Sequence, residues 1–295
     1  MPDHSSKATT PKPHRMLAAI RVSGADRYTL LQGQLTQDMS QLAPDKPLLA
    51  GWTNPKGRLI CLCWLFDWHN TLWLVVPDEL RDRITKRLKM FVLRADAQVE
   101  NSSLLVQPAN KETLNSLFSS KDLLELKDTY DCFYSDSIFF LKQAGLAIGS
   151  SVTAGNTTSW RLANIRAGIP SLWTETCELF IPQMLNLDLL GAISFSKGCY
   201  VGQEIIARTQ NLGRIKRRMY GFKVPSGRHI QPGDPVYIEN GTTVGTVVDA
   251  IPSDTVTELL AVIRIELLAH SLSLAKDGSS VLKPVSLPYT IPETV

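Results

Sequence analysis

The chain has 295 residues, of which 44% are hydrophobic and 20% charged, which is typical of a soluble globular protein with a large core and two or three domains. Its five cysteines lack the spacing of a disulfide framework, and no apolar run approaches the ~20 residues that span a bilayer. We therefore expect a cytoplasmic protein that has no membrane partner and begins with a disordered lead over residues 1–15.

The formal net charge is only +3, but the charge is unevenly distributed. Seven basic residues and no acidic one lie between Ile205 and Gly233, and the rest of the chain has 24 basic against 28 acidic residues. This local basicity indicates one anion-facing patch within residues 208–228.

The first part of the chain predicts a strand over 17–22 and then a helix that Ser23 caps, with Asp26 as the reciprocal partner. Apolar residues continue at helical spacing as far as Met39. Gly33 lies inside this predicted helix, where packing against a neighbour is the simplest reason for a glycine.

Residues 54–58 form a predicted Asn-Pro turn, followed by a hairpin of two buried strands over 59–66 and 71–76. Cys61 and Cys63 lie on one face of the first strand. Because no further ligands of suitable spacing lie nearby, we expect core packing and no metal site.

Further along, the sequence predicts a helix that Asp78 caps, a strand over 98–107, a short helix over 111–118 and strands over 137–141 and 145–153. A helix over 158–167 carries Trp160 and ends at Gly168. Glycine-rich nucleotide motifs are missing from this alternation of strands and helices.

The most informative stretch is Lys197-Gly198-Cys199-Tyr200-Val201-Gly202-Gln203-Glu204, whose second half overlaps a predicted helix over 201–209. Gly198 and Gly202 would let the chain turn and present Cys199 at a surface. Lys197 and a helix N-terminus would both favour the Cys199 thiolate and lower the pKa of the thiol. The alternative is that Cys199 is a small buried apolar residue, as most free cysteines are.

From residue 214 onward, short strands are separated by turns rich in proline and glycine. Asn240-Gly241 is a strong hairpin signal, and another strand is expected over 258–267. This unit, residues 214–295, is predicted to be a small all-β domain and most simply a β-barrel.

The stretch 197–204 resembles the signature of the YgfZ family of folate-binding proteins, relatives of the glycine-cleavage T-protein, an aminomethyltransferase. Residues 32–36 (Gln-Gly-Gln-Leu-Thr) are similar to a second family pattern. The resemblance implies an α+β fold in which antiparallel T-protein-like domains, here residues 16–213 in two subdomains, surround a central folate cavity. It also implies a C-terminal β-barrel and tetrahydrofolate or another reduced folate as the cofactor.

The resemblance further implies roles for individual residues. Cys199 would be the functional thiol, with Lys197, Gln203 and Glu204 shaping and holding its loop. The cofactor-binding positions would be Trp160, Leu17 and Tyr200, although Leu17 stands where some relatives have a second aromatic contact. Arg166 departs from the family, because relatives place there a Glu that can accept hydrogen bonds from the pterin, whereas an Arg offers only donors.

We expect a non-catalytic or weakly catalytic folate-binding accessory protein that supports assembly or repair of iron–sulfur enzymes and thereby tRNA modification. One alternative is a tetrahydrofolate-dependent aminomethyl or other one-carbon transferase. The T-protein acids would then stand at Cys61 and Leu62, which leaves that chemistry without its carboxylate. The second alternative is an RNA-binding module that uses the basic stretch 208–228.

Overall fold

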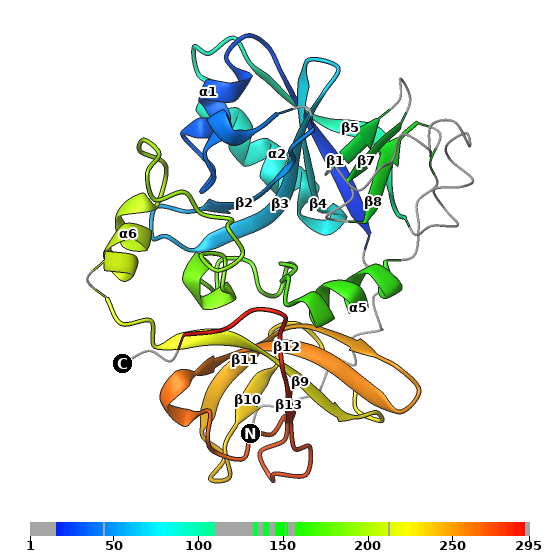
Figure 1. The fold of residues 1–295 in the computed structure, drawn as a ribbon, viewed down its shortest axis with the longest axis vertical. Coiled ribbons are helices and arrows are strands. Elements are labelled where there is room, and N and C mark those ends of the chain that lie inside the picture. The colour runs from blue at the N-terminus through cyan, green and yellow to red at the C-terminus, as the bar shows by residue number, and fades with distance from the viewer. Residues whose placement is uncertain are drawn as a thin grey trace, which may run out of the picture.

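The computed structural model describes residues 16–43, 45–109, 132–134, 138–141, 145–150, 152, 157–211 and 213–292. They form two antiparallel sheets with a middle layer of helices and loops between them (Figure 1). This confirms the predicted antiparallel α+β architecture. The lead over 1–15 and the helix expected over 111–118 lie outside the described residues.

The first sheet has eight strands in the order β2-β3-β4-β1-β5-β8-β7-β6. Its strands are β1 Leu17–Ser23, β2 Leu48–Thr53, β3 Leu59–Trp68, β4 Thr71–Pro77, β5 Gln98–Pro108, β6 Cys132–Tyr134, β7 Ile138–Leu141 and β8 Leu146–Gly149. The described helices are α1 Arg27–Gln32, α2 Asp78–Val92, α5 Thr158–Ala167 and α6 Gln203–Asn211, with short 3-10 helices at Met39–Gln41, Pro182–Leu185 and Ile265–Leu267.

The predicted hairpin of β3 and β4 is confirmed, and its turn is tighter than expected. Trp68 pairs with Thr71, so only His69 and Asn70 form the loop. Both have left-handed backbone angles, with φ of 53° and 56°. A two-residue turn of this hand matches the natural twist of a hairpin.

The helix after β1 is shorter than predicted and is not capped by Ser23. Gly24, with φ of 99°, turns the chain, and α1 begins only at Arg27. The Asp26 carboxylate accepts from the Asp96 amide (2.8 Å), so the side chain serves a contact distant in sequence instead of a cap. Gly33 ends α1 as its C-cap, so it does not lie inside a helix.

Helix α2 packs Leu80, Ile84 and Leu88 onto one face of the first sheet, as its periodicity predicts. Asp78 is its first residue instead of its cap, a place that Pro77 takes. The opposite face of the sheet is rich in aromatic side chains, namely Trp64, Phe66, Trp68 and Trp73. The first sheet therefore has helices on one face and an aromatic wall on the other.

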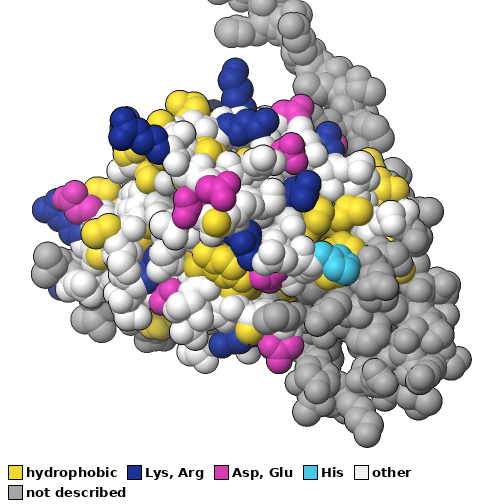
Figure 2. All heavy atoms as spheres, turned by 90° about the horizontal axis from the view of Figure 1, so that it is seen from above, with side chains coloured by type: hydrophobic (Ala, Val, Ile, Leu, Met, Phe, Trp, Pro, Cys, Tyr) yellow, Lys and Arg dark blue, Asp and Glu magenta, His cyan; other side chains and the backbone are white. Residues whose placement is uncertain are grey.

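The outer surface carries charges of both signs. Figure 2 views the molecule from above and shows Lys and Arg interspersed with Asp, Glu and apolar side chains. Among the described residues, no helix is long and apolar enough to cross a membrane.

The second sheet has five strands in the order β10-β11-β12-β9-β13. Its strands are β9 Arg217–Pro225, β10 Pro235–Tyr237, β11 Thr243–Pro252, β12 Val256–Arg264 and β13 Lys283–Val285. The Asn240-Gly241 hairpin lies between β10 and β11 as predicted. The expected C-terminal β-barrel is not confirmed, because within residues 213–292 no continuous ladder closes the sheet. In this range the isolated bridges Tyr237–Ser273 and Ser273–Val281 extend the sheet beyond the edge strand β10.

Helix α5 attaches the middle layer to the second sheet through two ion pairs of different burial (Figure 1). The Arg161 guanidinium binds the Asp249 carboxylate on β11, where both side chains are nearly inaccessible to solvent. It also lies 4.9 Å from the centre of the Trp173 ring. Arg166, one turn further on, pairs with Glu258 on β12 at 2.6 Å but is itself largely exposed.

We expect Asp249→Asn to lower the free energy of unfolding by about 3–5 kcal/mol, because it leaves the Arg161 charge buried and unpaired. Arg166→Ala removes the matched exposed cation from the same helix and should change stability much less. Urea unfolding followed by circular dichroism measures both. Equal losses in the two variants would contradict this account of how α5 is held.

Candidate functional site

A cleft lies between the aromatic face of the first sheet and the segment that follows α5. Its inner part encloses about 30 Å³, room for only one or two water molecules. The side chains around it are mostly apolar: Leu17, Leu49, Leu62, Trp64, Val75, Pro77, Leu146, Trp160, Asn164, Ile169, Pro170, Ser171 and Leu172. The amide of Asn164 and the hydroxyl of Ser171 are the uncharged polar groups of this set.

The cleft continues into a wider outer part of about 520 Å³. The two parts share Leu49, Trp64 and Ile169, so they are neighbouring regions of one depression. The outer part adds polar side chains, namely Gln37, Gln41 and Lys46. The cleft is therefore apolar inside and polar, with one cation, at its mouth.

The structure brings together two of the residues predicted to bind the cofactor. Leu17, at the start of β1, and Trp160, in the first turn of α5, both line the inner part. Arg166 is directed elsewhere: its guanidinium binds both oxygens of Glu258, and this hydrogen bonding holds the pKa of the Glu258 carboxyl below its usual value. The Arg at this position is thus explained by attachment to the second sheet.

The stretch 197–204 forms a loop beside the cleft, and Lys197 anchors it. The Lys197 ammonium is buried and donates to three backbone carbonyls, those of Gln32 (2.7 Å), Leu35 (2.8 Å) and Gln37 (2.7 Å). Burial lowers the pKa of Lys197 to about 8, and the charge of Asp38 opposes the shift. The amine is therefore bound to the segment that follows α1.

Gly202 packs this loop against the turn over 54–57. Thr53 donates its hydroxyl to the Val201 carbonyl at 2.6 Å. Gly202 has φ of 84°, and a Cβ there would lie 2.5 Å from the Asn54 carbonyl oxygen. Gly57 has φ of 67°, and a Cβ there would lie 2.9 Å from the Cβ of Ile205 in α6. Glycine is required at both positions, because both backbone angles are left-handed and a Cβ at either would clash with the opposite segment.

Cys199 lies at the exposed tip of the loop. Gly198 beside it is also exposed, has no positive φ, and has open space where a Cβ would be. The geometry therefore does not demand glycine there, in contrast to Gly202. Helix α6 starts at Gln203, two residues later than expected, so Cys199 is four residues from its first turn. The predicted lowering of the Cys199 thiol pKa stays a prediction.

The other residues of the stretch have different surroundings. Tyr200 is buried in the core of the middle layer together with Leu62 and Leu172, and burial raises the pKa of its hydroxyl to about 12. The Lys197 ammonium lies 5.1 Å from the centre of the Tyr200 ring. Gln203 is half-buried, and Glu204 is exposed in the first turn of α6. Folate contact by Tyr200 and the roles of Gln203 and Glu204 stay predictions.

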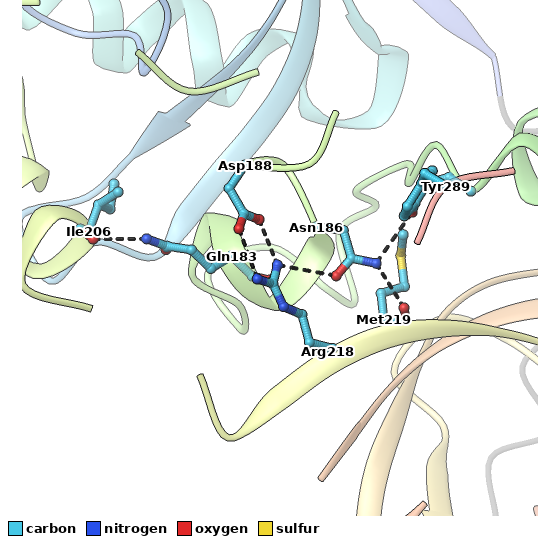
Figure 3. Close-up of polar contacts among 8 residues, drawn as sticks. Gln183, Asn186, Asp188, Ile206, Arg218, Met219 and Tyr289 are labelled. Carbon is cyan, nitrogen blue, oxygen red and sulfur yellow. Dashed lines mark hydrogen bonds and ion pairs between the residues drawn. The ribbon is translucent and has the colours of Figure 1, made fainter. Parts of the chain in front are cut away.

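A buried polar network around Arg218 was not foreseen from the sequence (Figure 3). Arg218 binds Asp188 through two hydrogen bonds, 2.6 and 2.8 Å long, and donates to the Gln183 carbonyl at 2.9 Å. Asn186 donates to the Met219 carbonyl of β9, while Gln183 donates to the Ile206 carbonyl of α6. One member of the predicted anion-facing basic stretch is thus an internal link between α6, the middle layer and the second sheet.

The other cysteines with described side chains lie apart from the exposed loop tip. Cys61 and Cys63 are buried, as predicted. Hydrogen bonding with Cys63, together with burial, raises the pKa of the Cys61 thiol well above its usual value, and burial raises the pKa of Cys177. Among the described residues, no group of three or more His, Cys, Asp or Glu side chains could hold a metal ion.

Known proteins similar to this chain support the resemblance seen in the sequence. The chain is 29% identical in sequence to the tRNA-modifying protein YgfZ of Enterobacter sp. (strain 638), with 94% of this chain and 92% of that protein covered. It is also 29% identical, over the same shares, to the tRNA-modifying protein YgfZ of Escherichia coli O45:K1. No family model matches the chain.

The fold is similar to the crystal structure of glycine cleavage system aminomethyltransferase T from Bartonella henselae. The TM-score is 0.68 at 15% sequence identity, with 92% of this chain and 83% of that chain covered. The resemblance to YgfZ proteins and the T-protein-like fold are confirmed.

We expect Gly202→Ala to destabilise the protein by about 2 kcal/mol or more, because an L-residue at this backbone angle is strained and its Cβ would meet the Asn54 carbonyl. Gly198→Ala is the matched control and should leave the melting temperature nearly unchanged. Calorimetric melting of both variants measures the difference. If Gly198→Ala were the more destabilising change, the assigned packing of this loop would be wrong.

Proposed function

We propose that this protein is a cytoplasmic folate-binding accessory protein that supports the assembly or repair of iron–sulfur enzymes and, through them, tRNA modification. The observation that carries the proposal is the cleft, which places Trp160 and Leu17 together within a T-protein-like fold. The names of the similar YgfZ proteins agree with a role in tRNA modification.

The chemistry of the cleft fits a reduced folate. Its apolar inner wall suits a ring that stacks on Trp160, while Asn164 and Ser171 offer hydrogen bonds to ring substituents. The outer part has the volume of a small-molecule site, and Lys46 with Gln37 and Gln41 suits the carboxylates of a glutamate tail. The inner part is narrow, so the ring would enter by displacing side chains such as Leu17.

The exposed thiol is the second part of the proposal. A bound folate supplies one-carbon or redox chemistry of its own, whereas Cys199 offers a sulfur nucleophile or ligand at the surface. Phe195, 45% exposed, lies four residues before Cys199 in the sequence, with Lys197 between them. An exposed apolar side chain in the same segment as an accessible thiol suits contact with a client protein.

One position in the inner part of the cleft argues against the transferase alternative. Leu62 lines the inner part, and Cys61 points to the opposite face of β3, into the core beneath α2. An apolar side chain therefore stands where the T-protein resemblance implies a carboxylate. The wall offers no general acid or base at that point.

The RNA-binding alternative rests on four exposed cations around the end of α6 and the start of β9: Arg208, Arg214, Lys216 and Arg217. Two other members of the basic stretch are engaged, because Arg218 is buried against Asp188 and Lys223 lies 3.8 Å from Glu258. The seventh member, Arg228, is also exposed but lies beyond the end of β9. A direct contact with nucleic acid through the four cations near α6 would be electrostatic and strongly dependent on salt.

We expect Trp160→Ala to weaken binding of tetrahydrofolate by about 1–3 kcal/mol, by analogy with the stacking of bases on aromatic side chains. Isothermal titration calorimetry measures the dissociation constant. Phe91→Ala removes a partly exposed aromatic ring of α2 from the far face of the sheet and serves as the control. An unchanged constant in folded Trp160→Ala, or no binding by the unaltered protein, would refute the proposed site.

A further inference from the structure

The two stretches that carry the family resemblance, residues 32–36 and 197–204, are hydrogen-bonded to each other. Lys197 is the centre of this contact, because its three N–H donors match the carbonyls of Gln32, Leu35 and Gln37 one for one. The Gln32 carbonyl is in the last turn of α1, where backbone acceptors lack partners within the helix, and the carbonyls of Leu35 and Gln37 follow the helix. A compact ammonium can donate to all three carbonyls from one point, whereas the donors of a guanidinium are fixed in one plane.

Backbone and side-chain bonds extend the contact in both directions. The Val201 amide donates to the Gly33 carbonyl at 3.2 Å, and the Ser194 amide donates to the Thr36 carbonyl at 2.9 Å. Thr36 returns its hydroxyl to the Ala192 carbonyl at 2.7 Å. Residues 191–202, which carry Cys199 and form the thiol loop, are therefore hydrogen-bonded at several points to residues 32–37 at the end of α1 and after it.

Both partners of this contact also form the rim of the cleft. Gln37, whose carbonyl accepts from Lys197, lines the outer part, and so does Gly191. The Gln37 side-chain amide donates to the Gly191 carbonyl at 2.5 Å. A ligand in the outer part would therefore touch the same two segments that Lys197 joins, and Cys199 lies two residues from that lysine.

We propose that Lys197 is a positioning residue that joins the thiol loop to the rim of the cleft, so that a ligand in the cleft alters the reactivity of Cys199. The coupling to the ligand rests on the proposed folate-binding function, whereas the joining of the two segments does not. Linkage requires the effect to be reciprocal, so a change at the loop also alters affinity for the ligand. Lys197 therefore acts through the loop and not as the group that reacts.

The first arm of the test needs no ligand. Lys197→Met keeps the length of the side chain but removes all three donors, while Lys216→Met removes an exposed lysine as the matched control. Amide hydrogen exchange of Val201 and Ser194 reports the bonds between the two segments directly. We expect exchange at both amides to be at least tenfold faster in Lys197→Met and unchanged in Lys216→Met; equal exchange in the two variants would overturn the proposal.

The second arm measures the alkylation rate of Cys199 by iodoacetamide, read from peptide masses, with and without saturating tetrahydrofolate. We expect the folate to slow alkylation fivefold or more in the unaltered protein and less than twofold in Lys197→Met that still binds it. Lys197→Arg, which retains donors and charge, should recover part of the response. A full response in Lys197→Met would overturn the proposal.

The two arms separate this inference from the proposed function. If calorimetry shows that the unaltered protein binds no tetrahydrofolate, the proposed function fails, and the exchange rates alone decide whether Lys197 joins the segments. If folate binds but leaves Cys199 alkylation unchanged, the coupling is wrong while the folate site stands. Should Lys197→Met not fold, Thr36→Val removes a neighbouring link and should lessen the response to folate; a full response there would count against the proposal.

Discussion

The middle layer of this protein depends on the pairing of buried cations. Arg161 with Asp249, Arg218 with Asp188, and Lys197 with three carbonyls are each largely removed from water. A charge buried in this way is tolerated only when its partners are in place. Each cation and its partners come from different segments, so the three contacts join α5 to β11, β9 to the segment at Asp188, and the thiol loop to the end of α1 and the residues after it.

The position of the cleft follows from this arrangement. One wall is the aromatic face of the first sheet, and the other is the chain from Trp160 to Leu172, which Arg161 holds to the second sheet. The rim at Gln37 and Gly191 is held by the contact that Lys197 anchors. Because the walls of the cleft come from separate elements, its shape depends on the contacts of Arg161 and Lys197 that hold those elements together.

Local patterns predicted local structure well. The hairpins at His69-Asn70 and Asn240-Gly241, the apolar face of α2 and the end of α5 at Gly168 all depend on near neighbours in the sequence. The late start of α1 could not be predicted in this way, because Asp26 binds Asp96, seventy residues away. The bridges at Ser273, which extend the second sheet beyond β10, also reflect pairing at a distance.

The candidate site was predictable only in part for the same reason. Trp160 and Leu17 were identified through the family resemblance, since they lie more than a hundred residues apart. Lys197 stood out for its place beside a cysteine, yet its partners lie about 160 residues earlier in the chain. Arg218 belonged to a basic run typical of an exposed patch, and only the fold shows that Asp188 neutralises it.

The central claim is that the cleft between the first sheet and the middle layer holds a reduced folate. A crystal structure of the protein grown with tetrahydrofolate under reducing conditions tests it most directly. The account predicts a ring between Leu17, Leu62 and Trp160 and a glutamate tail toward Lys46. A folate bound elsewhere on the chain, or an inner cleft still closed in crystals of protein that binds folate in solution, would contradict it.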